Sequence, residues 1–119
     1  MQKTISIAMS IVLSLVIAVS SISILKVGKS VTTDLSMSGT TATCFVNVRS
    51  EKSTDNIEIS VKLYCGDEVV AEWNGVSSEG TLYFSRTATV KKGKTYVMKT
   101  SCSINGKSYS ISDITKKCK

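Results

Sequence analysis

The chain contains no histidine and no proline among its 119 residues. The absence of histidine excludes Ser-His-Asp triads, Cys-His dyads, histidine-ligated zinc and an imidazole pH switch within this chain. The four cysteines are spaced 21, 37 and 16 residues apart. That spacing lacks the close pairs typical of a Cys₄ zinc site and the Cys-x-x-Cys pair of a redox centre. The sequence therefore predicts no metal site and no cofactor.

Nucleotide binding and acid-base catalysis are also disfavoured. Gly28-Lys29-Ser30 has the end of a P-loop, but Ser23 stands where that motif needs its first glycine. The nine carboxylates fit solvated strand faces and turns, although a glycosidase pair depends on distances in space that the sequence does not give. We predict that the protein is not an enzyme.

A long uncharged segment follows Lys3 near the N-terminus. Residues 5–25 carry no charged side chain, and 15 of these 21 residues are Ile, Leu, Val, Ala or Met. A basic start, an apolar stretch and small residues at its end are typical of a secretory signal peptide. We predict a signal peptide over residues 1–25, cleaved near Ser20 in Ala18-Val19-Ser20 or after Ser21 or Ser23, and a secreted protein.

An uncleaved membrane anchor is the alternative for the same segment. As a helix, 21 residues reach about 31 Å, which is enough to span a bilayer. Lys26 and Lys29 weaken the charge asymmetry that would fix its orientation. In that case the protein would be membrane-anchored through residues 5–25.

Residues 26–119 show short alternating runs of apolar and polar residues, bounded by glycine and asparagine, in place of helical periodicity. The clearest run places Ile57, Ile59, Val61, Leu63 and Cys65 on one face. The turn signal is strongest at Asn105-Gly106, because both positions tolerate positive φ. We expect seven strands, covering or beginning within residues 31–37, 42–49, 57–65, 69–73, 82–90, 96–104 and 109–111. Seven short strands in this length predict one all-β domain, an immunoglobulin-like antiparallel sandwich preceded by the N-terminal apolar helix.

Single residues in this pattern have structural explanations. Trp73 is expected to pack in the core or at an edge. Arg86 interrupts an apolar strand face, so we expect it at an edge or paired with Glu58 or Glu72.

The cysteines are expected to form disulfides if the protein is exported to an oxidising compartment. Four cysteines allow three pairings. Cys44 and Cys102 fall on the apolar faces of the second and sixth predicted strands, which face each other across an immunoglobulin-like core. We therefore favour Cys44–Cys102 with Cys65–Cys118, and keep Cys44–Cys65 with Cys102–Cys118 as the alternative.

Positive charge is concentrated at the C-terminal end of the sequence. After residue 89 there are eight lysines and one aspartate, a net charge of +7, whereas residues 26–89 hold six basic and eight acidic side chains. Such an excess attracts polyanions in a salt-dependent way. We predict weak contact with anionic cell-envelope polymers or lipid headgroups through Lys91, Lys92, Lys94, Lys116, Lys117 and Lys119, with a merely solubilising lysine surface as the alternative. Nucleic acid is disfavoured, because all eight cations are lysine and no aromatic ladder accompanies them.

Several short motifs occur in a consistent order. They are Thr41-Ala42-Thr43-Cys44, the Ile57-to-Leu63 strand, Trp73, Val90-x-x-Gly93-x-Thr95-Tyr96 and Asn105-Gly106. Over roughly residues 30–115 this order resembles a family of short exported proteins of Gram-positive bacteria that is classed as a domain of unknown function. The resemblance implies an exported all-β domain with no transferable catalytic residues.

These observations lead to two functional hypotheses. The first is an exported, non-enzymatic binding or structural module of the cell envelope. The alternative is a diffusible small cationic effector, such as a bacteriocin-like toxin or an inhibitor of a secreted protein. The sequence indicates no specific ligand, partner or oligomeric state.

Overall fold

The computed structural model of the chain describes residues 17–26 and 29–119, which form nine β-strands. The strands are β1 (Ile17–Lys26), β2 (Lys29–Ser38), β3 (Thr41–Arg49), β4 (Ile57–Cys65), β5 (Glu68–Ser77), β6 (Thr81–Thr89), β7 (Thr95–Ile104), β8 (Lys107–Ser110) and β9 (Ile114–Lys117). Each of the seven predicted strands corresponds to one of β2 to β8. The prediction of an all-β domain is confirmed.

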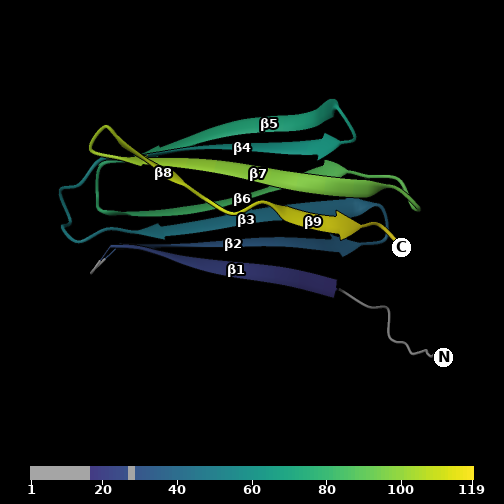
Figure 1. Cartoon of the computed structure of the whole chain (residues 1–119), viewed down its shortest axis with the longest axis horizontal. Helices are drawn as coiled ribbons and strands as arrows, with labels where there is room; N and C mark the ends of the chain where they lie inside the picture. The colour runs from purple at the N-terminus through teal and green to yellow at the C-terminus, as the bar shows by residue number, and fades with distance from the viewer. Residues whose placement is uncertain (1–16, 27–28) are drawn as a thin grey trace.

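The strands form two antiparallel sheets that enclose one core (Figure 1). Sheet A has the order β1-β2-β3-β6, and sheet B has the order β5-β4-β7-β8. The short strand β9 also pairs with β7, beside its first half, while β8 pairs beside its second half. Together β8 and β9 complete one edge of sheet B, and β5 forms the other.

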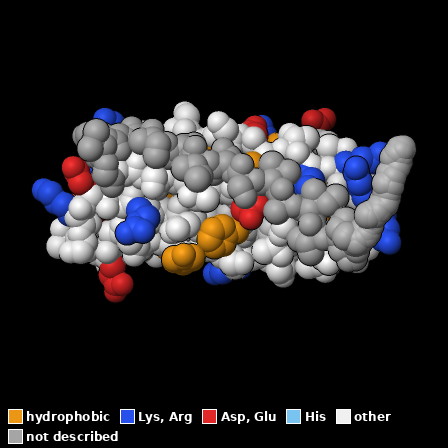
Figure 2. Space-filling view, turned by 90° about the horizontal axis from the view of Figure 1, so that it is seen from below, with side chains coloured by type: hydrophobic (Ala, Val, Ile, Leu, Met, Phe, Trp, Pro, Cys, Tyr) orange, Lys and Arg blue, Asp and Glu red, His pale blue; other side chains and the backbone are white. Residues whose placement is uncertain are grey.

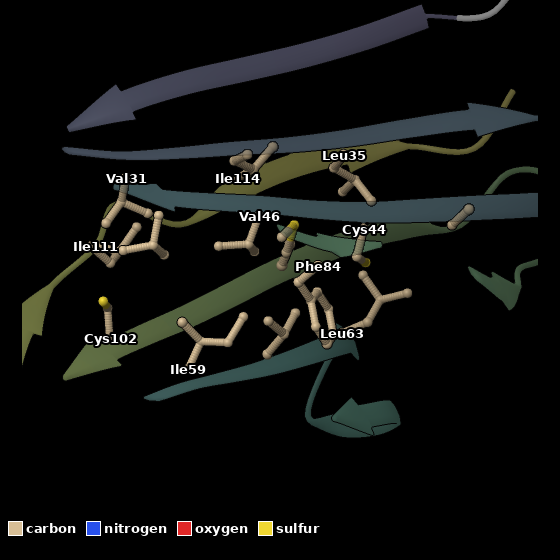
Figure 3. Packing of buried hydrophobic residues seen from close by; sticks show 14 of the residues in the cluster. Val31, Leu35, Cys44, Val46, Ile59, Leu63, Phe84, Cys102, Ile111 and Ile114 are labelled. Carbon is tan, nitrogen blue, oxygen red and sulfur yellow. The ribbon is translucent and has the colours of Figure 1, made fainter. Parts of the chain in front are cut away.

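The core is built from the inward faces predicted by the alternation. Side chains at alternate positions of β2, β3, β4 and β7 are almost completely buried, as are Leu82 and Phe84 of β6. Figure 3 shows these apolar side chains from both sheets meeting between the layers. Burial of apolar area is the main favourable contribution to the stability of a domain of this kind.

The edge near β5 and β6 explains two residues that interrupt the apolar pattern. Trp73 is half-buried and lies edge-on to Phe84, with ring centroids 6.2 Å apart. Arg86 is exposed, and its guanidinium lies 4.8 Å from the centre of the same Phe84 ring. Arg86 lies at an edge, as expected, because β6 is the last strand of sheet A, and there it makes a cation–π contact. Glu72, one of its two predicted partners, pairs with Lys62 instead.

Turn residues adopt the conformations that their chemistry permits. Asn105 has φ 52° and Gly106 has φ 84°, and they connect β7 to β8 as the predicted hairpin. This left-handed pair is the geometry for which Asn-Gly is favoured.

The N-terminal segment differs from the expected helix wherever the structure describes it. Residues 17–26 form strand β1, which pairs with β2 from Ile17↔Met37 to Lys26↔Lys29. The segment is rich in Ile, Val and Ser, and β-branched residues favour extended backbone when a neighbouring strand supplies hydrogen bonds. The rest of the predicted signal or anchor helix, residues 1–16, lies outside the described residues. Within the described ranges, no helix has the length and apolar character needed to cross a membrane.

Candidate functional site

The lysines that the sequence separates into two groups come together at one end of the sandwich. Lys91, Lys92 and Lys94 lie in the loop between β6 and β7, and the others lie in β9 and the tail that follows it. The backbone N–H of Gly93 donates to the carbonyl of Cys118 at 2.6 Å, and the N–H of Cys118 donates to the carbonyl of Lys94 at 2.8 Å. We call loop 90–94, tail 117–119 and the adjoining turn 38–40 the lysine end.

Buried anchors on both sides hold this loop in place. The N–H of Val90, a core residue, donates to the carbonyl of Thr40 at 2.8 Å. The N–H of Lys91 donates to the hydroxyl of Tyr96 at 2.8 Å. In the tail, the buried Cys118 thiol donates to the carbonyl of Gly39 at 3.3 Å. The lysine end is therefore a fixed surface, in which side-chain and backbone contacts of the flanking residues position the lysines.

Five of the six predicted lysines present their side chains to solvent. These are Lys91, Lys92, Lys94, Lys117 and Lys119. Figure 2 shows basic side chains gathered at the right-hand end of the molecule, the end at which the C-terminus lies in Figure 1. The grouping gives one region of high local positive charge.

Lys116 does not belong to that exposed surface, in contrast to the expectation. It is 8% exposed, because it shares with Ile114 the inward face of β9. Removal from water lowers the pKa of Lys116, the positive charge of Lys119 lowers it further, and the carboxylate of Asp34 acts in the opposite direction. No strand was predicted over residues 114–117, so the alternation that places Lys116 on the same face as Ile114 was not recognised from the sequence.

The exposed lysines have no acidic partner among the described residues. The ion pairs there are Lys62–Glu72 at 3.8 Å and Lys99–Asp113 at 3.5 Å. Asp67, in the turn after β4, and Glu68, the first residue of β5, lie at the same end of sheet B but form no ion pair with the lysines of the loop or the tail. The positive charge of the lysine end thus remains available to an external anion.

All four cysteines are free thiols, and neither predicted pair is formed. Cys44 and Cys102 are both buried and face inward from opposite sheets, as their positions on the apolar faces of the predicted strands indicated. Burial raises the pKa of each thiol to about 11.

The two thiols differ in their position along the strands, as Figure 3 shows. Strands β3 and β7 both end at the end of the sandwich opposite the lysine end. Cys44 lies six residues before Ser50, which follows β3, whereas Cys102 lies only three residues before Asn105, which follows β7. At about 3.3 Å per residue the offset is about 10 Å, beyond the 4.4–6.8 Å usual between bonded cysteine Cα atoms.

The second predicted pair is separated sideways. Cys65 pairs with Tyr96 on one side of β7, and Cys118 follows β9 on the other side. Two strand spacings amount to about 9.6 Å, which is again too far for a disulfide. The sequence could not show which cysteines are close enough to form a disulfide, because that distance depends on strand register as well as on the face that each cysteine occupies.

The opposite end of the sandwich is organised around Asp55. We call loop 50–56, turn 78–80 and hairpin turn 105–106 the Asp55 end. The carboxylate accepts hydrogen bonds from the Ser50 hydroxyl at 2.5 Å, the Asn105 side-chain amide at 2.9 Å and the Lys52 N–H at 3.1 Å. These bonds, led by those from Ser50 and Asn105, lower the pKa of Asp55 to about 2.

Backbone bonds extend this network across three loops. The N–H of Gly80 donates to the carbonyl of Asp55 at 3.1 Å, and the N–H of Asn105 donates to the carbonyl of Asn56 at 2.8 Å. Asp55 is only 6% exposed, so the expectation of a solvated surface charge was wrong. Its role in this arrangement is to connect loops. No sequence pattern identified it, because its donors are 3, 5 and 50 residues away.

A surface groove that sequence reasoning missed lies beside the Asp55 end. It has a volume of about 580 Å³ and is lined by residues that include Asn56, Glu58, Val76, Ser77 and Asn105. A smaller depression of about 220 Å³ continues over the outer face of sheet B. Glu58 is the acidic side chain that lines both. Among residues 17–26 and 29–119, no three His, Cys, Asp or Glu side chains are grouped to hold a metal ion.

Comparison with known proteins adds no identification: no family model, no curated protein and no solved structure matches this chain.

Proposed function

We propose that this protein is an exported, non-enzymatic module that binds phosphate-bearing anionic polymers of the cell envelope through its lysine end. The observation that carries the proposal is the grouping, on a fixed loop and tail, of five exposed lysines that have no ion-pair partner within residues 17–26 and 29–119. Lysine ammonium groups act as compact charges, which suits a flexible chain of phosphates better than a geometrically specific ligand.

The proposed location rests on the apolar segment described above. Residues 5–25 have the composition of an export signal, and the family that the chain resembles is exported. Outside a Gram-positive cell the abundant phosphate-bearing anions are wall teichoic acids and the headgroups of anionic lipids. Both offer the same chemistry to a lysine cluster, so the proposal names phosphate anions and leaves the source to the experiment.

We further propose that the sandwich has the immunoglobulin-like strand arrangement. Strands β2, β3 and β6 then correspond to A, B and E, and strands β4, β7 and β8 correspond to C, F and G. The order of neighbours in each sheet supports this alignment, since β3 lies between β2 and β6, and β7 lies between β4 and β8. In such folds the loops at either end serve as contact surfaces carried on a rigid scaffold.

Binding of the full chain to purified wall teichoic acid, to phosphatidylglycerol vesicles and to neutral phosphatidylcholine vesicles tests the function. Each lysine near an anionic surface contributes about 1 kcal/mol to the free energy of binding. Replacing Lys91, Lys92 and Lys94 with Gln should therefore weaken binding more than tenfold. Screening by salt should also abolish most of the binding.

A matched control removes the same charge elsewhere, through Lys52→Gln, Lys62→Gln and Lys107→Gln. Retained binding in this control, with loss in the loop variant, supports a localised site. Equal loss in both variants would show that net charge alone governs binding and would overturn the proposal. So would an absence of binding to teichoic acid and phosphatidylglycerol at low salt.

A further inference from the structure

The outer face of sheet A presents a regular grid of side chains. Alternation along β2, β3 and β6 turns nine positions away from the core, in three rows across the sheet. The strand register aligns these rows as Thr32–Asn47–Tyr83, Asp34–Phe45–Ser85 and Ser36–Thr43–Thr87. With strands about 4.8 Å apart and alternate residues about 6.7 Å apart, the grid covers about 10 by 13 Å.

Two aromatic rings lie in contact on this grid. Tyr83 is 76% exposed, and its ring centroid is 5.7 Å from that of Phe45, with the ring planes tilted by 58°. A single exposed aromatic residue needs no explanation. Here the two rings touch, and the other seven side chains of the grid are short and polar, so the rings form one small apolar platform with polar neighbours.

The surround has the hydrogen-bonding character of an uncharged ligand site. Six of the nine positions are serine, threonine or asparagine, Asp34 is the single charge, and no position is lysine or arginine. Figure 2, which views the side where β1 and β2 lie in Figure 1, shows a small hydrophobic area with white, acidic and basic side chains around it. Hydroxyl and amide groups both donate and accept hydrogen bonds, which matches a ligand rich in hydroxyl groups.

We infer that the outer face of sheet A binds an uncharged polysaccharide, with Tyr83 and Phe45 as the stacking platform and Asn47 among its hydrogen-bonding groups. The C–H groups of a sugar ring carry partial positive charge and pack against the negative face of an aromatic ring. The area of the grid suits a few consecutive pyranose rings of an extended chain. A polyanion is disfavoured at the nine positions, because none of them is a cation and one is Asp34; Arg49, the next outward residue of β3, lies beyond Asn47 at the end of the grid.

Retention of the full chain on insoluble chitin, cellulose and xylan tests this inference. In about 1 M NaCl, where exposed charge interactions are screened, we expect retention on at least one of the three. Tyr83→Ala should reduce the binding constant at least about tenfold, since it removes the exposed ring of the platform. Tyr64→Ala is the matched control, because Tyr64 lies on the outer face of sheet B beside Lys99.

A second variant distinguishes loss of the binding face from a folding defect. Ser85→Arg places a long side chain in the middle row at an exposed position, so it should block the face without disturbing the core. Loss of retention in Tyr83→Ala and Ser85→Arg, with retention in Tyr64→Ala, supports the inference. Failure of all three materials to retain the protein, or equal retention of Tyr83→Ala and the unaltered chain, overturns it.

This inference stands apart from the proposed function. Retention by the aromatic face should survive high salt and the loop-lysine substitutions, whereas phosphate binding should be lost under both conditions. Conversely, Tyr83→Ala should leave binding to teichoic acid unchanged. The failure of either proposal is therefore distinguishable from the failure of the other.

Discussion

The two ends of the sandwich use charged residues in opposite ways. At the Asp55 end, one carboxylate is almost buried, and three donors from the protein itself satisfy it. At the lysine end, backbone bonds hold the loop and the tail together, and five ammonium groups extend from them into solvent. The difference indicates that charge at the Asp55 end maintains the fold, while charge at the lysine end is free for an external partner.

The largest expected effect comes from matched glycine substitutions at the two ends. A Cβ at Gly80, where φ is +77°, would lie 2.2 Å from the Lys52 carbonyl oxygen and 2.8 Å from the Ser53 Cα. Gly80→Ala should therefore lower the free energy of unfolding by at least about 3 kcal/mol. Gly93→Ala, with φ +88° and open space around the new methyl group, should cost only about 1–2 kcal/mol. Urea denaturation of both variants measures the contrast, and equal losses would contradict it.

The second largest effect on stability is expected at the Asp55 end when acid protonates Asp55. The folded pKa of Asp55 is about 2, below its ordinary value of 3.8, so the folded state favours the charged carboxylate. This contribution to stability is complete above about pH 4 and is lost as the pH falls toward about 2. The difference in unfolding free energy between the unaltered protein and Asp55→Asn, measured from pH 7 to 2, should shrink across that window. A difference that stays constant down to pH 2 would show that the carboxylate charge is not what matters.

A smaller effect of opposite sign is expected beside the lysine end, at Lys116. Burial lowers the pKa of this side chain, so folding carries a cost for keeping it charged. Lys116→Met retains the apolar stem and removes the charge, and should raise the thermal unfolding midpoint by a few degrees. A calorimetric scan measures the shift. A fall in the midpoint would mean that Lys116 has a stabilising partner.

The smallest effect on stability is expected from the exposed loop lysines. Replacing Lys91, Lys92 and Lys94 with Gln should change the free energy of unfolding by less than about 0.5 kcal/mol per site, because exposed charges without partners contribute little. The same denaturation curves used for the glycine pair provide the measurement. A large loss would remove the distinction between the two ends.

The sequence was most informative where burial and alternation coincide. The run from Ile57 to Cys65 has one apolar face, and its first four apolar residues are buried in the structure. Turn chemistry likewise placed Asn105-Gly106 at the β7–β8 hairpin. Such features depend on local periods of two residues, which are visible in a single sequence.

Features that depend on register or on distant partners were not predictable. The offset between Cys44 and Cys102 depends on strand lengths and loop connections, although the inward direction of both residues was evident. Asp55 was not recognised, because Asn105, one of its donors, lies 50 residues away and only the fold brings it near, although Ser50 and Lys52 belong to the same loop as Asp55. The lysine end could be proposed from composition, but its assembly needed the backbone bonds between Gly93, Lys94 and Cys118. Lys116 shows that membership of a charged cluster does not determine exposure.

Strand β1 has a consequence for the order of events during biogenesis. The predicted peptidase sites Ser20, Ser21 and Ser23 lie within the span that pairs with β2. A cut after Ser20 would separate the partner of Asp34 from the partner of Thr33, leaving the β2 edge from Asp34 to Met37 without its neighbour. Processing and completion of sheet A are therefore competing fates for the same residues, and whichever happens first determines which edge the finished molecule exposes.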